Sequence, residues 1–339
     1  MEATVTEKNI LIIHTGGTFV MESNEQGQLT PGCYAIDYIS KHIKPLFSAQ
    51  IDQHQLFNLD SSLFRPVHWV KIAEHIAENY EKYDGFVVIH GTDTMAYTAS
   101  ALSFMLKNLG KPVVLTGAQL PLIDRRSDAF MNLVDAIEVA QHSDIPEVML
   151  LFNHTVFRGN RTKKKNAWDF DAFYAPNYGP LLKLGIGIER KQYRIAPMPT
   201  GKFEIDTRFD ESVIVIPFFP GIDFSAFTLM VNEKRVHALI IEAYGSGNIP
   251  SDNTGLDQLF SDAAANEIPI AVCSQSPVGK IDLSLYEAAA KAKFYGLISA
   301  VDMTREATLV KMMIALGRYK NINEIKDFMS KNCAGEKEN

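Results

Sequence analysis

Near its amino terminus the chain reads Ile10-Leu-Ile-Ile-His-Thr-Gly-Gly-Thr-Phe19. The run Ile10–Ile13 is short and apolar, which is typical of a strand buried on both faces of a parallel sheet. Two glycines follow, and because neither carries a Cβ atom, the backbone can turn sharply and approach a ligand closely there. The hydroxyl of Thr18 lies just past this turn. The pattern fits a threonine nucleophile on a strained loop, an ordinary tight turn, or a glycine loop that cradles a phosphate.

The order of buried strand, polar strand end and helix repeats along the first half of the chain. Further strands are predicted near Gln50–Leu59, Gly85–His90, Pro112–Thr116 and Glu147–Phe152, with helices between them. Such alternation predicts right-handed βαβ units in a doubly wound, mostly parallel sheet. We therefore expect an α/β fold, with an N-terminal catalytic domain over residues 1–191.

A second, smaller α/β domain is expected over residues 213–339. Its strands are predicted near Val213–Ile216, His237–Ile241 and Pro269–Cys273. The segment 192–212 is weakly periodic and is interpreted as the interdomain linker. The length of 339 residues fits two domains, at about 100–200 residues each.

Charge and hydropathy narrow the class of protein. Lys and Arg total 33 and Asp and Glu total 40, and this net charge of −7 argues against nucleic acid or an anionic membrane as the main partner. The first residues lack the basic and apolar regions of a signal peptide, and no apolar run is long enough to span a membrane. A cytoplasmic protein is expected, and the net charge says nothing about a small zwitterionic substrate.

Cysteine and histidine usage predicts no metal and no cofactor. The 3 cysteines are far apart, which is typical of neither a disulfide framework nor a zinc site. No ligand spacing such as His-Glu-x-x-His occurs. His14 and His90 end two core strands, and they are predicted to be packed and hydrogen-bonded.

Four strand ends of the N-terminal domain carry hydroxyls, carboxylates or a backbone that a ligand can approach. In a parallel sheet the carboxyl ends of the strands lie along one edge, so these groups can converge on one crevice. They are Thr15 and Thr18, Asp60 with Ser61 and Ser62, Thr92 with Asp93 and Thr94, and Gly117 with Ala118. Each also has a structural interpretation; Asp93, for example, could cap the helix that follows it. Backbone N–H groups at the glycine turns are the expected oxyanion donors.

A threonine nucleophile needs a base or a cation nearby, because its hydroxyl has a high pKa. The loop after the strand near Glu147–Phe152 carries Lys163, Lys164 and Lys165. A lysine desolvated beside Thr92 could accept a proton through that hydroxyl, with the neighbouring carboxylate holding the ammonium. Three consecutive lysines are more often a solvated basic loop.

Several blocks together resemble the bacterial-type L-asparaginases. Two signature blocks are matched by Thr15-Gly-Gly-Thr18 and by Gly85-Phe-Val-Val-Ile-His-Gly-Thr-Asp-Thr-Met-Ala-Tyr97. Collinear matches continue along nearly the whole chain in Leu115-Thr-Gly-Ala-Gln119, Arg158-Gly-Asn-Arg-Thr162, Asn177-Tyr-Gly-Pro180, Tyr244-Gly-Ser-Gly-Asn248 and Asp302-Met-Thr304. The Arg-Gly-Asn-Arg block and the missing signal peptide resemble the cytoplasmic, type I branch of that family.

The resemblance implies a reaction and roles for individual residues. Thr18 matches the nucleophile that forms an acyl-enzyme with the side chain of asparagine, which implies hydrolysis of L-asparagine to L-aspartate and ammonia. Thr92, Asp93 and Lys164 match the second hydroxyl, its carboxylate and its ammonium, with a slip of one residue left open for the lysine. The implied substrate contacts are Asp60, Ser61, Ser62, Thr92 and Asp93 around the α-carboxylate and α-amino group, and Ala118 near the departing amide. The family also implies a homodimer or a dimer of dimers.

Two positions depart from the family. The tyrosine that relatives often carry on the mobile loop after the nucleophile is replaced by Gln28. Tyr286 resembles the C-terminal tyrosine of some type I relatives, and it is assigned that role in preference to Tyr34. Glu242 stands where an allosteric relative has an arginine that contacts effector asparagine, which leaves open whether such an effector site exists here.

Other functions remain compatible with parts of the pattern. A non-catalytic sensor of acidic amino acids would use the same fold without releasing ammonia. The amide-hydrolysing subunit of a tRNA amidotransferase resembles the asparaginases but normally has an N-terminal extension, whereas this chain starts almost directly with its first strand. A dinucleotide site would need Gly-x-Gly-x-x-Gly, which Gly16-Gly17 lacks. The sequence does not predict whether asparagine or glutamine is the preferred substrate, because one methylene changes the binding free energy by only about 1–3 kcal/mol.

Overall fold

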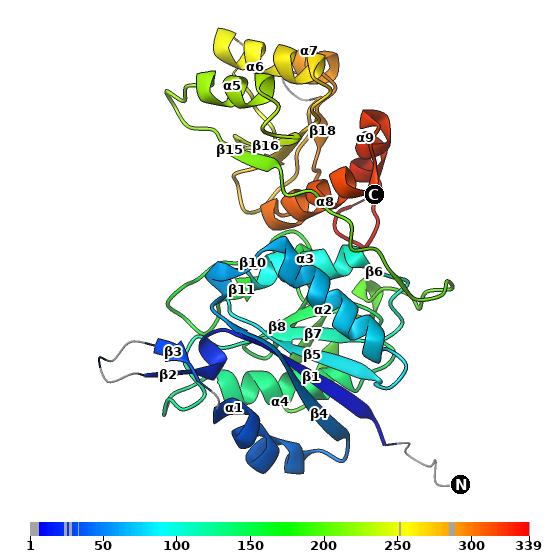
Figure 1. Cartoon of the computed structure of the whole chain (residues 1–339). Coiled ribbons are helices and arrows are strands. Elements are labelled where there is room, and N and C mark those ends of the chain that lie inside the picture. Colours follow the sequence, from blue (N-terminus) through cyan, green and yellow to red (C-terminus); the bar gives the residue numbers. More distant parts are fainter. Residues whose placement is uncertain are drawn as a thin grey trace. The chain divides into compact units, whose positions relative to one another are not determined.

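The computed structural model describes residues 7–23, 26, 29–32, 34–250, 252–284 and 289–338 (Figure 1). The chain forms two compact units, Met1–Asp206 and Thr207–Asn339. Residues 192–206, predicted as part of the linker, belong to the first unit, where β14 (Glu204–Ile205) pairs with β6 (Leu106–Lys107).

A mixed sheet forms the centre of the first unit. In the part of the chain that the structure describes it has eight strands, in the order β13-β12-β9-β8-β7-β5-β1-β4. The parallel part comprises β4 (Gln50–Leu59), β1 (Asn9–Gly16), β5 (Gly85–Ile89), β7 (Val113–Thr116) and β8 (Val148–Phe152). The antiparallel part comprises β9 (Thr155–Arg158), β12 (Leu182–Leu184) and β13 (Ile188–Arg190). The predicted α/β class with a mostly parallel sheet is confirmed.

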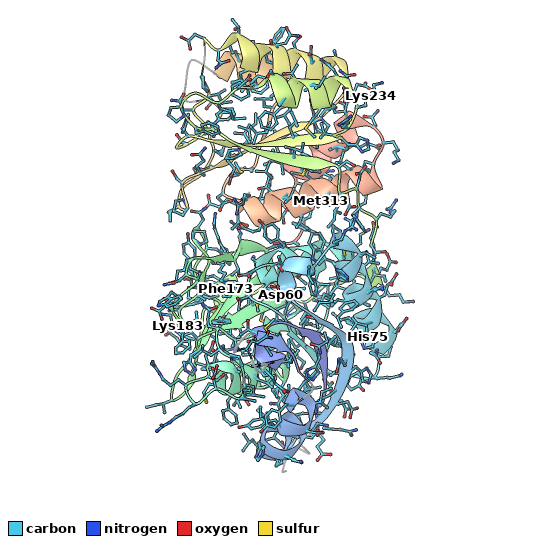
Figure 2. All side chains as sticks on the ribbon, turned by 60° about the vertical axis from the view of Figure 1, so that its left-hand side comes forward. Asp60, His75, Phe173, Lys183, Lys234 and Met313 are labelled. Atoms are coloured by element: carbon cyan, nitrogen blue, oxygen red, sulfur yellow. The ribbon has the colours of Figure 1, made fainter. Side chains whose placement is uncertain are left out.

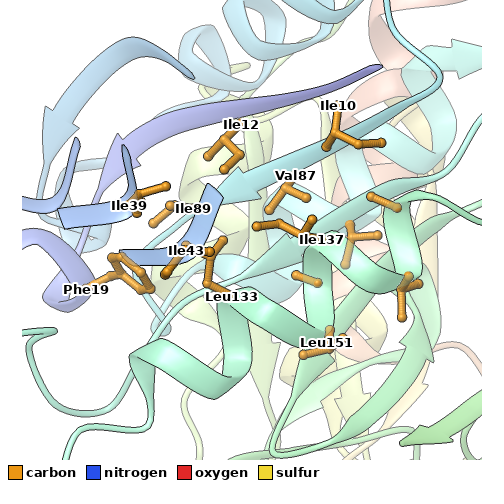
Figure 3. Packing of buried hydrophobic residues seen from close by; sticks show 14 of the residues in the cluster. Ile10, Ile12, Phe19, Ile39, Ile43, Val87, Ile89, Leu133, Ile137 and Leu151 are labelled. Atoms are coloured by element: carbon orange, nitrogen blue, oxygen red, sulfur yellow. The ribbon is translucent and has the colours of Figure 1, made fainter. Parts of the chain in front are cut away.

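Helices cover both faces of this sheet, which explains why its central strands are apolar throughout. Figure 1 shows α2 (Pro66–Asn79) and α3 (Met95–Met105) on one face, with α1 (Tyr34–Tyr38) and α4 (Ala129–Ala140) on the other. Side chains alternate along a strand, so β1 and β5 supply residues to both layers. Figure 3 shows the layer against α4, in which Ile12, Val87 and Ile137 gather in one fully buried cluster.

The second unit is a smaller α/β layer structure. Its parallel sheet has the order β15-β16-β17-β18, formed by Val213–Pro217, Ala238–Ala243, Ile270–Ser274 and Ile298–Ser299. Figure 1 shows α5 (Ser225–Asn232), α6 (Thr254–Ala265) and α7 (Ala289–Phe294) on one side of it, and α8 (Arg305–Arg318) on the other, next to α9 (Ile322–Ser330). The predicted smaller α/β domain is confirmed, and it contains a fourth strand, β18, that the sequence did not indicate.

Candidate functional site

The turn after β1 brings three strand ends within van der Waals contact. Gly16 has φ +105° and Gly17 has φ +81°, a region that favours glycine. A Cβ atom on Gly16 would lie 2.3 Å from the backbone N of Leu59, and one on Gly17 would lie 2.3 Å from the Cα of Gly91. The end of β1 therefore touches the last residues of β4 and the segment that follows β5. The N–H of Gly17 donates to the carbonyl of Leu59 (2.9 Å), so this expected oxyanion donor is already engaged.

The segment after β4 packs against the segment after β5. A Cβ atom on Gly91 would lie 2.6 Å from the Oγ of Ser61, and the hydroxyl of Thr94 donates to the carbonyl of Ser61 (2.9 Å). Asp60, labelled in Figure 2, caps the short helix η4 (Ser61–Leu63), because its Oδ1 accepts the N–H of Ser62 (2.7 Å). These contacts hold the loop Asp60–Ser62 beside the glycine turn. This is the loop that is predicted to bind the α-carboxylate and α-amino group of the substrate.

The two threonines of the first signature block have different surroundings. Thr15 is fully buried, and its hydroxyl donates to the carbonyl of Ile89 (2.8 Å), which ties β1 to β5. Thr18 begins the short helix η1 (Thr18–Val20) and is half-buried. Its hydroxyl makes no hydrogen bond with any residue that the structure describes. Of the two, Thr18 is the more exposed residue.

Lys164 reaches the segment after β5 from a different part of the chain. Strand β10 (Lys163–Lys164) pairs antiparallel with β11 (Phe173–Tyr174), and Phe173 is labelled in Figure 2. The Nζ of Lys164 donates to the Oγ1 of Thr92 (2.8 Å) and to the Oδ1 of Asp93 (2.7 Å). The structure therefore brings Thr92, Asp93 and Lys164 together in one hydrogen-bonded group.

The three side chains of this group differ in solvent exposure. Thr92 is 6% exposed, whereas the side chains of Lys164 and Asp93 are 20% and 67% exposed. The ammonium is thus largely withdrawn from water while the carboxylate keeps an open face. Asp93 does not cap the helix, contrary to the alternative considered above, because α3 begins at Met95 and the N-cap position belongs to Thr94.

The loop after β7 closes the site from the side of Ala118, which is 1% exposed. The carboxylate of Asp128 accepts the N–H groups of Gln119 (3.0 Å) and Leu120 (3.1 Å) and so fixes this loop. The side chain of Gln119 accepts from the hydroxyl of Thr92 (3.4 Å) and donates to the carbonyl of Asp169 (2.9 Å). Sequence reasoning did not select Gln119, although it ends the block that contains Ala118.

The two strand-end histidines are packed and hydrogen-bonded, as predicted. Burial lowers the pKa of His14 and the pKa of His90 to about 4, so both rings are neutral at pH 7. The ring of His90 contacts the carbonyl of Gly91 (2.7 Å) and the hydroxyl of Thr98 (2.9 Å). Neither ring is a candidate proton carrier at neutral pH.

The sequence also singled out Gln28, Tyr286, Tyr34 and Glu242. Gln28 and Tyr286 lie outside the described residues. Tyr34 is 46% exposed, and its N–H donates to the Oε1 of Glu22 (3.3 Å). Glu242 lies on β16 of the second unit, where its carboxylate is 3.7 Å from the guanidinium of Arg305.

Neither a metal-binding cluster nor a membrane-spanning helix occurs among the described residues. No group of three or more His, Cys, Asp and Glu side chains is arranged to hold a metal ion among them. Within the same ranges, no helix combines the length and the apolar character needed to cross a membrane.

Comparison with known proteins gives matches over nearly the whole chain. The family model "Asparaginase, N-terminal" matches residues 9–196, and "Glutaminase/Asparaginase C-terminal domain" matches residues 212–329. "L-asparaginase 1" of Escherichia coli K12 is 39% identical, over 97% of this chain and 98% of that protein. A glutamyl-tRNA(Gln) amidotransferase component of Pyrococcus abyssi is 36% identical, over 96% of this chain and 76% of that protein. The solved thermostable L-asparaginase from Thermococcus kodakarensis is 33% identical with a TM-score of 0.90, over 98% of this chain and 99% of that one.

Proposed function

The chain belongs to the asparaginase family, and from this premise we propose that it hydrolyses the side-chain amide of L-asparagine to L-aspartate and ammonia. The observation that carries the proposal is the contact of the Lys164 ammonium with Thr92 and Asp93, next to the turn that presents Thr18. A hydroxyl for attack and a lysine to move protons are what such a hydrolysis requires in the absence of a histidine base.

In the proposed mechanism, the Oγ1 of Thr18 attacks the side-chain carbonyl carbon of the substrate. The C–N bond then breaks, and the nitrogen leaves as ammonia with the proton that Thr18 lost. Water adds to the resulting ester, the bond to Thr18 breaks, and the threonine regains a proton. Thr92 and Lys164 are the groups proposed to carry these protons, while Asp93 stabilises the ammonium form of the lysine.

The substrate's α-carboxylate and α-amino group are proposed to lie against the loop Asp60–Ser62. The open face of the Asp93 carboxylate supports a further contact with the α-amino group, because most of it faces solvent. Ala118 is proposed to line the side from which the amide nitrogen departs. Tyr286 is proposed to assist Thr18.

The nucleophile is tested by replacing one side chain in two ways. Thr18→Ala should lower kcat for ammonia release from asparagine by about three orders of magnitude or more, whereas Thr18→Ser keeps a hydroxyl and should retain measurable activity. Mass spectrometry of quenched wild-type enzyme should detect the acyl-enzyme, and Thr18→Ala should not form it. Equal ammonia release by wild type and Thr18→Ala would remove Thr18 as the nucleophile. Tight aspartate binding without any ammonia release would favour the amino acid sensor.

A second candidate is amide hydrolysis within a tRNA-dependent amidotransferase, which the Pyrococcus abyssi relative favours. The two candidates differ in their behaviour toward free amino acids. Steady hydrolysis of free asparagine by this chain alone supports the asparaginase, and release of ammonia only with a second protein and charged tRNA supports the amidotransferase. The same assay with glutamine measures the selectivity between the two amides.

We also propose a homodimer or a dimer of dimers in the cytoplasm. The widely spaced cysteines are compatible with a reducing compartment. Sedimentation velocity at several protein concentrations would measure the oligomeric state, and a monomer at every concentration would contradict the proposal.

A further inference from the structure

A small cavity lies directly behind the glycine turn. It is lined by His14 and Gly16 of β1, by Val20 and Gly32 at the two ends of a hairpin, and by Asn58 of β4. The hairpin consists of β2 (Met21–Ser23) and β3 (Leu29–Pro31), and the N–H of Gly32 donates to the carbonyl of Val20 (2.9 Å) at its base. The space open to the centre of a water-sized molecule is about 10 Å³, close to what a single water needs.

His14, one of the residues that line this cavity, has a hydrogen-bond acceptor without a partner among the described residues. The residue is 2% exposed, and its Nε2 contacts the Oε1 of Gln53 (3.0 Å). The amide nitrogen of Gln53 donates to the carbonyl of Ile36 (3.2 Å) and the hydroxyl of Ser40 (3.0 Å), which fixes its Oε1 as an acceptor. The proton of His14 is therefore on Nε2, and Nδ1 carries a lone pair. That Nδ1 is buried without a hydrogen-bond partner among the described residues.

Asn58 supplies a second acceptor. Its Nδ2 donates to the carbonyl of Gly32 (3.3 Å), so its Oδ1 is the free end of the amide. This Oδ1 is also buried and unpartnered within the described part of the chain. Two acceptors cannot satisfy each other, and buried polar atoms are rarely left without a partner. Both can be satisfied by a molecule between them that donates two hydrogen bonds.

We propose that this cavity is a binding site for one small neutral molecule that donates hydrogen bonds to the Nδ1 of His14 and the Oδ1 of Asn58. Water and ammonia have this chemistry in common, since each fits the space and offers two or more hydrogens. Ammonia as the source rests on the proposed function, which releases it, whereas water does not. The bound molecule joins His14 of β1, two residues before Gly16, to Asn58 of β4, whose amide also holds the base of the hairpin through the carbonyl of Gly32. It therefore supports the turn that presents Thr18.

The site is tested by the ¹⁵N chemical shifts of histidine side chains in the whole protein. His14 should be protonated on Nε2, with its Nδ1 at the frequency of a hydrogen-bonded acceptor. His90 serves as an internal reference of the opposite tautomer, because its Nδ1 faces the carbonyl of Gly91. A proton on the Nδ1 of His14, or an Nδ1 frequency typical of an unbonded nitrogen, overturns the proposal.

Two variants show whether the hydrogen bond to the Nδ1 of His14 comes from a bound molecule or from another side chain of the protein. Asn58→Leu removes one of the two acceptors and should shift the Nδ1 resonance of His14. Gln55 also lines the cavity and is exposed. Its side-chain amide is the alternative donor, because it could rotate and donate a hydrogen bond to the Nδ1 of His14. Gln55→Ala should leave the His14 resonance unchanged. If Gln55→Ala instead returns Nδ1 to the unbonded frequency, the donor is a side chain and the proposal fails.

Titration distinguishes the two sources. At alkaline pH, a saturable shift of the His14 Nδ1 resonance with ammonium chloride, but not with potassium chloride at the same ionic strength, identifies ammonia. A hydrogen-bonded Nδ1 that responds to neither salt identifies water. Both results support the site. A protein that fails to hydrolyse asparagine but keeps the hydrogen-bonded Nδ1 would refute the proposed function and leave the water site intact.

Discussion

Each unit of the molecule contains a lysine ammonium held by a carboxylate. In the first unit the Nζ of Lys164 lies 2.7 Å from the Oδ1 of Asp93, and in the second the Nζ of Lys311 on α8 lies 2.5 Å from the Oε1 of Glu336. The two pairs differ in burial, because Lys311 and Glu336 are 0% exposed whereas the Asp93 side chain is 67% exposed. A lysine–carboxylate contact alone therefore does not identify a functional site.

The other partners of each ammonium account for the difference. Lys311 donates to the backbone carbonyls of Met329 (3.2 Å) and Lys331, while Glu336 accepts backbone N–H groups, including that of Ala334 (2.7 Å). Burial raises the pKa of Glu336, but the ammonium and the backbone donors outweigh it, so the pKa lies below its usual value. Carbonyls hold this ammonium without relaying its proton. The Lys164 ammonium instead contacts the hydroxyl of Thr92, which can pass a proton on.

The largest effect is expected at the first pair. Lys164→Met should lower kcat by about two to four orders of magnitude, the usual range for losing a general acid–base group, with little change in Tm. Lys163→Met is the matched control, because neighbouring side chains of a strand point to opposite sides and Lys163 should not reach Thr92. Equal losses in both variants would show that the charge of the loop, and not the contact of Lys164, matters.

At the second pair the loss should appear in stability. Lys311→Met leaves the Glu336 carboxylate buried without its cation, which typically costs about 3–5 kcal/mol of unfolding free energy. The kcat per folded molecule should stay unchanged. The double variant Lys311→Met/Glu336→Leu should recover much of the loss, since it removes both charges. Urea unfolding of the three proteins measures this, and a double variant no more stable than the single one would contradict it.

The sequence predicted the first region far better than the second. Strands β1 and β5 are apolar runs followed by hydroxyls and acids, and a parallel sheet necessarily gathers such ends on one edge. Lys164 was selected from its two neighbours only through the family resemblance, because the pairing of β10 with β11 is a tertiary feature without a local pattern. Glu336 lies 25 residues from Lys311 in a polar tail, and nothing in its sequence indicates burial.

Below pH 7, the two regions should lose unfolding free energy at different pH values. His14 and His90 titrate at about 4 in the folded chain against 6.5 for the ordinary value, so the unfolded chain binds more protons between these pH values. Each histidine should therefore remove about 3 kcal/mol of stability as the pH falls from about 7 to about 4. The carboxylate of Glu336 loses its contribution only at lower pH, since its folded pKa lies below 4.5.

Unfolding free energies of wild type and His90→Gln between pH 7 and pH 4.5 measure this effect. The variant should be less stable at pH 7 and should show a shallower decline, because one of the two buried rings no longer titrates. Parallel profiles of the two proteins would mean that His90 is not responsible for the decline.

The smallest effect is expected at Lys165, the third lysine of the same loop. Its ammonium pairs with Asp171, and the two side chains are 35% and 57% exposed. An exposed pair of this kind contributes at most about 1 kcal/mol and is weakened by salt. Lys165→Met should therefore leave kcat within about twofold and lower Tm slightly, by less at high salt than at low salt. The interpretation of the lysine run as a solvated basic loop then holds for Lys165 and fails for Lys164, because the Lys164 ammonium contacts Thr92 whereas the Lys165 ammonium pairs with Asp171. A loss of activity in Lys165→Met as large as that in Lys164→Met would remove this distinction.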